Sequence, residues 1–87
     1  MMTLELRQLD MQRNNLSGAL PSSIGRLTQL LYLNLKDNVL LSGRLPLPEL
    51  STLFKLSRLS LVHCSFENKD EAREILRSAL PRCKIWM

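Results

Sequence analysis

A single pattern of leucines recurs three times along the chain and limits the folds that the chain can adopt. The pattern reads LxxLxLxxNxL, and its copies are LRQLDMQRNNL at 6–16, LLYLNLKDNVL at 30–40 and LSRLSLVHCSF at 56–66. Their first leucines are 24 and 26 residues apart. Such a period is typical of units that stack side by side, because one unit of about 25 residues cannot bury its own apolar side chains.

Apolar and polar residues alternate within each copy over a short stretch. The inward pairs are Leu9 and Met11, Leu33 and Leu35, and Leu59 and Leu61. This period of two predicts three short strands centred near Leu9, Leu33 and Leu59, each with one face in a core. Stacked units run in the same direction, so the strands are expected to pair in parallel.

The ninth position of the pattern is occupied by Asn14, Asn38 and Cys64. An Asn amide both donates and accepts hydrogen bonds, so it can satisfy backbone groups in its own turn and in the neighbouring one. We therefore expect Asn14 and Asn38 to point inward and close their strands, with Cys64 as a substitute.

The three copies resemble the units of leucine-rich repeat proteins. The segments LSGALPSSIGRL at 16–27 and LSGRLPLPELSTL at 41–53 resemble the plant-type LSGxLPxxIGxL continuation, and ALPRCKIW at 79–86 resembles an intracellular-type C-terminal cap. The resemblance implies an α/β fold, a leucine-rich-repeat solenoid of about three repeats with its parallel sheet on the concave side. It also implies a protein that binds other proteins through that concave face.

The connecting segments carry residues that suit turns. Gly18 and Gly43 permit a turn, while Pro21 and Pro46 suit an extended segment that gives no ladder hydrogen bond. We expect a short helix to begin near Pro48.

The end of the chain departs from the leucine pattern. Apolar residues from Ala72 to Leu80 recur at helical spacing, which predicts an amphipathic capping helix near Asn68 to Leu80, with Asn68 as its N-cap. We expect Trp86 to pack beneath this helix. The chain is divided accordingly into one domain, 1–87, with repeats at about 6–29, 30–55 and 56–66 and a cap at about 67–87.

Catalytic and metal-binding chemistry has little support in the sequence. His63 and Cys64 are neighbours at the end of a strand and should point to opposite faces, which argues against a Cys–His dyad. A metal site from His63, Cys64 and Cys83 would need three ligands at unrelated spacings, and a Cys64–Cys83 disulfide is disfavoured in a reducing compartment. We predict no enzyme activity and no cofactor.

The outward positions of the strands form the predicted binding face. Tyr32 and Arg58 are the expected anchors, because both residue types are enriched where binding energy concentrates. Arg13 opposite Asp37 also fits a simple cross-strand charge pair. The predicted partner-binding residues are Gln8, Asp10, Gln12, Arg13, Tyr32, Asn34, Lys36, Asp37, Arg58, Ser60 and His63.

A non-catalytic module that holds a partner protein is the function that these features predict. The net charge of +4 favours an acidic partner. Nucleic acid is disfavoured, because the Lys and Arg residues are scattered without a basic run. Two alternatives stay open: a structural or adaptor subunit of a larger assembly, including a ribonucleoprotein, and a fragment of a ligand-sensing receptor.

Cellular location and the N-terminal flank are the remaining predictions. MMTLELRQLD carries charges where a secretory signal would be apolar, and polar residues interrupt every leucine cluster, so we expect a cytoplasmic protein without a membrane span. Nothing before Leu6 resembles a cap. We expect another chain or further repeats to cover Leu6, Leu9, Met11 and Leu16.

Overall fold

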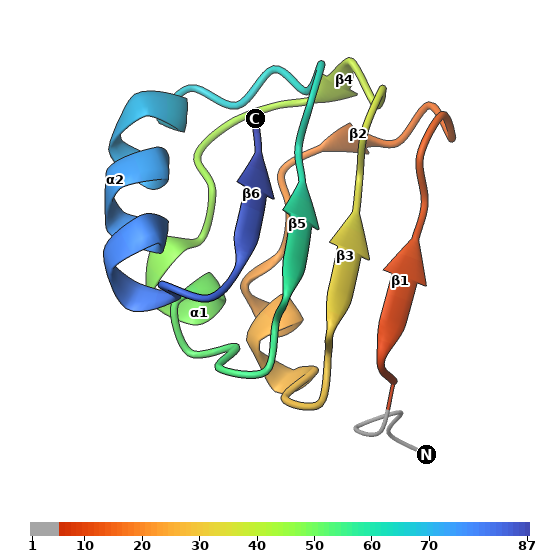
Figure 1. The fold of residues 1–87 in the computed structure, drawn as a ribbon. Coiled ribbons are helices and arrows are strands. Elements are labelled where there is room, and N and C mark those ends of the chain that lie inside the picture. The colour runs from red at the N-terminus through yellow and green to blue at the C-terminus, as the bar shows by residue number, and fades with distance from the viewer. Residues whose placement is uncertain (1–5) are drawn as a thin grey trace.

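Four strands form one parallel sheet in the computed structural model, which describes residues 6–87. They are β1 (Gln8–Asp10), β3 (Tyr32–Asn34), β5 (Arg58–Ser60) and β6 (Lys84–Trp86), side by side in that order (Figure 1). Their register aligns Leu9, Leu33, Leu59 and Ile85 in one inward row. The three predicted strands and their parallel pairing are confirmed, in a mixed α/β fold.

The chain returns from each strand to the next behind this sheet (Figure 1). We call the stretch from one strand of the sheet to the next a coil. The first coil contains β2 (Ser17–Gly18) and the 3-10 helix η1 (Ser22–Arg26), and the second contains β4 (Leu40–Leu41) and α1 (Leu47–Leu50). The third contains α2 (Lys69–Ala79). β2 and β4 pair in parallel, and α1 contacts both η1 and α2.

The core lies between the main sheet and the helical segments. Leucines of the second and third coils, such as Leu33, Leu59 and Leu76, have 0% of their surface exposed. Because each such side chain contributes about 1.5–3 kcal/mol by leaving water, these rows are the main drive for folding. The equivalent first-coil residues are only partly buried, since within residues 6–87 they have one neighbouring coil; they are Leu6, Leu9, Met11 and Leu16.

The amide of Asn38 joins the first coil to the second. Its Oδ1 accepts hydrogen bonds from the backbone N–H groups of Asn14 and Leu16, both at 3.0 Å. Its Nδ2 donates to the carbonyls of Met11, at 2.9 Å, and of Leu35, at 2.8 Å. The side chain is fully buried. The predicted inward role of Asn38 is confirmed, and it acts on two coils at once.

The other two ninth-position residues behave differently from each other. Cys64 is buried, and its Sγ donates to the Leu35 carbonyl at 3.1 Å, so it substitutes for Asn as predicted. The prediction for Asn14 is wrong, because its side chain is exposed. An inward amide needs the turn of a preceding coil to bind, and residues 6–87 contain no such turn beside Asn14.

Two glycines shape the turns at the ends of β2 and β4. Gly18 and Gly43 have φ values of 80° and 73°, in the left-handed region that residues with a Cβ rarely adopt. The prediction that they permit these turns is confirmed. The short helix expected near Pro48 is α1, whereas η1 was not predicted from the Pro21 segment.

The capping helix occupies the predicted position, within one residue at each end. Asn68 precedes it but makes no side-chain capping bond. Its Oδ1 instead accepts from the Leu45 N–H at 2.8 Å, so this buried amide holds the second coil to the third. None of the helices within residues 6–87 is both long and apolar enough to cross a membrane.

The segment after α2 corrects a second prediction. It forms the strand β6 at the sheet edge, with Ile85 in the inward row. Residues in a strand alternate between faces, so Trp86 points outward and is 46% exposed. The expectation that Trp86 packs beneath the helix is therefore wrong.

Asn38 and Asn14 provide a matched pair for a stability test, because they occupy the same place in successive copies. Asn38→Ala should lower the free energy of unfolding by about 3 kcal/mol, since it leaves buried backbone groups of two coils unsatisfied. Asn14→Ala should change it by less than about 0.5 kcal/mol. Urea unfolding of the two variants measures both values, and equal effects would contradict the linking role of Asn38.

Candidate functional site

The side of the main sheet away from the helical segments carries the predicted binding residues. One column across this face contains Gln8, Tyr32, Arg58 and Lys84, and the next contains Asp10, Asn34, Ser60 and Trp86. The predicted alignment of these columns is confirmed for the first three strands. β6 extends each column by one residue that sequence reasoning missed.

A shallow hollow on this face, which we call the sheet basin, has a volume of about 430 Å³. It is lined by Gln12, Tyr32, Asn34, Lys36, Arg58, Ser60, Val62 and Trp86. Six of the predicted residues thus come together around one hollow, and Trp86 joins them. Gln8 and Asp10 lie outside it on β1, at the far edge of the sheet.

The floor of the sheet basin is made of two nearly buried polar side chains. Asn34 is 6% exposed and Ser60 is 9% exposed. Asn34 accepts a hydrogen bond from the Lys36 N–H at 3.0 Å and donates its Nδ2 to the Tyr32 hydroxyl at 3.1 Å. Asn34 therefore fixes the Tyr32 ring, and it offers little surface of its own to a partner.

The rim of the sheet basin is aromatic and cationic. Trp86 and Arg58 are exposed, and Tyr32 and Lys36 are partly buried. Within residues 6–87, neither Lys36, Arg58 nor Lys84 takes part in an ion pair. Their charges are therefore open to an anionic ligand, which the positive potential of the face would attract.

A separate chain of charges runs across the turns that follow the strands. Arg13, Asp37 and His63 occupy equivalent positions, with φ values of 58°, 64° and 64°. Asp37 Oδ1 lies 2.6 Å from His63 Nδ1, and its Oδ2 lies 3.4 Å from Arg13 Nε. The cross-strand pairing of Arg13 with Asp37 is confirmed, and Asp37 contacts both Arg13 and His63 outside the sheet basin.

The pKa of the Asp37 carboxyl is lowered from its usual 3.8, mainly by the hydrogen bond from His63. Loss of solvation opposes this shift, and the contact with Arg13 adds a smaller lowering effect. A lowered pKa means that the folded state prefers the ionised carboxylate. This stabilisation is present above the unfolded pKa and is lost as the pH falls through the folded value.

The two cysteines are free thiols, and neither is activated. Burial raises the pKa of Cys64, and it raises the pKa of Cys83 to about 11, so both stay protonated at neutral pH. Cys64 is buried while the His63 side chain is 68% exposed, which confirms that the two point to opposite sides. In the described part of the chain, no three His, Cys, Asp or Glu side chains are placed to hold a metal ion.

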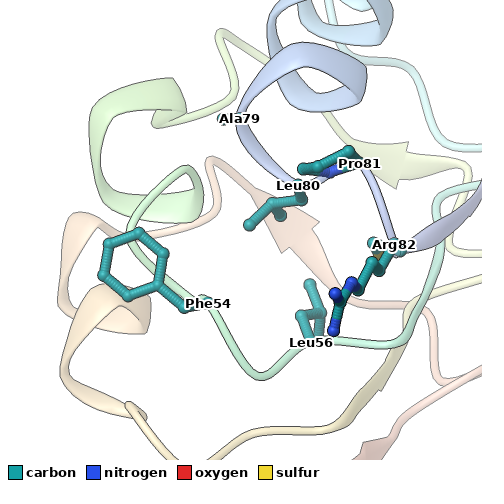
Figure 2. A pocket seen from close by; sticks show the side chains of 7 residues that line it. Phe54, Leu56, Ala79, Leu80, Pro81 and Arg82 are labelled. Carbon is teal, nitrogen blue, oxygen red and sulfur yellow. The ribbon is translucent and has the colours of Figure 1, made fainter.

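A second hollow of about 210 Å³ lies beside the C-terminal end of α2. Figure 2 shows the Phe54 ring on one side of it and Leu80, Leu56 and Arg82 on the other. Phe54 is 81% exposed. The walls are apolar apart from Arg82, so this hollow lacks the convergent polar groups that orient a ligand. It shares no residue with the sheet basin.

Comparison with known proteins supports the leucine-rich repeat resemblance. Residues 5–27 match the family model described as Leucine Rich Repeat, which covers the first copy of the pattern and the η1 segment. Neither the curated proteins nor the solved structures gave a match to the chain. The comparisons therefore support a leucine-rich repeat protein and leave the partner to be inferred from the sheet itself.

The pH dependence of stability tests the role of Asp37. From neutral pH downward, the wild-type chain should lose stability as the pH falls through the lowered Asp37 pKa, and Asp37→Asn should lose less over that range. In the His63→Ala variant the Asp37 pKa should rise toward 3.8, because its largest lowering contact is gone. Carboxyl-carbon NMR titration measures this pKa, and an unchanged value would contradict the assignment.

Proposed function

We propose that the chain is a non-catalytic protein-binding module that holds its partner in the sheet basin. In this proposal residues 1–87 form a single leucine-rich-repeat solenoid, with repeats at about 6–29, 30–55 and 56–66, a cap at about 67–87 and the sheet on the concave side. The observation that carries the proposal is the rim of the basin, where Trp86, Tyr32 and Arg58 surround a floor fixed by the sheet.

The residue types on this rim favour a protein partner. Trp, Tyr and Arg are the residues most enriched where alanine replacement costs the most binding energy. The Tyr32 ring is held by Asn34, and the rim residues stand on paired strands, so little conformational freedom is lost on binding. We place the protein in the cytoplasm, where two free thiols stay reduced.

A second candidate function is that of a subunit embedded in a larger assembly, and the first coil favours it. Its residues Leu6, Leu9, Met11 and Leu16 are partly exposed on the outer flank, and β1 is an edge strand of the sheet that residues 6–87 form. Asn14 is exposed beside them, in the place where Asn38 binds the turn of its neighbour. A partner chain or a further coil that covered this flank would bury these groups.

Replacing Tyr32 and Arg58 together by Ala should abolish binding of the partner protein. Each side chain belongs to a class whose loss costs about 2 kcal/mol or more at an anchor position, so the combined loss should exceed a hundredfold in affinity. The measurement is quantitative mass spectrometry of proteins retained by the immobilised chain from its native source. Proteins held by the wild type and lost by the double variant are the expected result.

Two further variants make this comparison decisive. Phe54→Ala removes an exposed aromatic ring outside the sheet basin and should leave retention unchanged. Asn14→Arg places a bulky charge on the outer flank of the first coil. If the Tyr32→Ala, Arg58→Ala double variant still retains the partner and Asn14→Arg loses it, binding through the sheet basin is rejected. That result would favour a subunit that is embedded through its first coil.

A further inference from the structure

The positive charges of the sheet basin are separated along the strand direction. Lys36 aligns with Val62, because the ladder of β3 and β5 continues through the bond from the Asp37 N–H to the Val62 carbonyl at 2.8 Å. Arg58 lies four residues before Val62. At about 3.3 Å per residue, the two cations are therefore attached roughly 13 Å apart along the strands.

The middle of the sheet basin, between these cations, differs from both ends. Its floor consists of the small Ser60 side chain and the nearly buried Asn34. Trp86 stands beside Ser60 in the same register, and Val62 lies at the end near Lys36. The sequence of environments along the strand direction is therefore cationic, then uncharged with a small polar floor and an aromatic wall, and then cationic again.

We infer that the sheet basin binds an extended acidic peptide segment, with carboxylates four residues apart and an apolar or aromatic side chain midway between them. In an extended peptide, side chains at i, i+2 and i+4 share one face, and the outer two are roughly 13 Å apart. This spacing matches Arg58 and Lys36, and it places the middle side chain on Ser60 against Trp86. The inference rests on the proposed function and adds the chemistry of the partner.

Charge complementarity supports an acidic occupant. Arg58 can bind a carboxylate through two parallel N–H donors, and Lys84 adds positive charge beside it in the same column. The nearby Asp37 carboxylate is already bound by His63 and Arg13. Asp10 is aligned with Asn34 on the neighbouring strand but does not line the basin.

A peptide fits this arrangement better than a nucleic acid strand does. A nucleic acid carries a phosphate at every nucleotide, so some phosphates would lie over the uncharged middle of the basin, where the lining residues include no cation. Single-strand binding surfaces instead follow the backbone with a continuous positive groove. The sheet basin has cations only at its two ends.

The probe for a direct test is the labelled peptide Gly-Ser-Glu-Ser-Phe-Ser-Glu-Ser-Gly, measured by fluorescence anisotropy against the full 87-residue chain. The wild type should bind it at least tenfold more tightly than peptides with Lys in place of both Glu residues, with the Glu residues two positions apart, or with Gly in place of Phe. Added salt should weaken binding, since exposed charges are screened.

Single variants of the chain locate the two carboxylates. Arg58→Gln and Lys36→Gln should each reduce affinity for the probe about tenfold, and Phe54→Ala should not change it. Circular dichroism of each variant checks that the fold is kept. Equal binding of all the peptides, tighter binding of an oligothymidine, or full affinity in Arg58→Gln would each overturn the inference. If the native partner still depends on Tyr32 and Arg58 in that case, the proposed function stands and only the acidic-peptide assignment fails.

Discussion

The leucines of each coil are buried only by the coil beside it, and the rest of the structure depends on this constraint. Leu33 and Leu59 have 0% exposed surface because a coil lies on each side of them, whereas Leu9, which has one neighbouring coil within residues 6–87, is partly buried. A coil shifted by one residue would turn its leucines to solvent, since side chains alternate between the faces of a strand. Burial therefore sets the register of the sheet as well as its stability.

The register in turn produces the binding face. Once Leu9, Leu33, Leu59 and Ile85 are aligned inward, the residues on either side of them are aligned outward. Residues far apart in sequence, such as Tyr32, Arg58 and Trp86, then line one hollow because the aligned strands place them on the same face. Buried amides reinforce the alignment, because Asn38 and Asn68 each bind the backbone of the preceding coil.

Sequence periodicity was sufficient for the strands, the columns and α2, because each depends on local spacing. It was insufficient where the outcome depends on neighbouring coils. Asn14 occupies the same position of the leucine pattern as Asn38, yet it is exposed because residues 6–87 provide no preceding turn for its side chain to bind. Asn68 looked like a helix cap and instead binds Leu45 across coils. The segment KIW at 84–86 is only three residues long, which is too short for its alternation to predict a strand. The large apolar area of Trp86 suggested burial instead.

The placement of Trp86 is the point at which fold and proposed function meet, and its fluorescence tests both, because it is the single tryptophan of the chain. The measurement is quenching by iodide, an anion, compared with quenching by caesium, a cation. An exposed indole beside Arg58 and Lys84 should be quenched more strongly by iodide than by caesium, because the two cations attract the anion. Arg58→Gln removes one of these charges and should reduce the difference between the two quenchers. Emission typical of a buried indole, with neither ion able to quench it, would place Trp86 beneath α2 and contradict the basin.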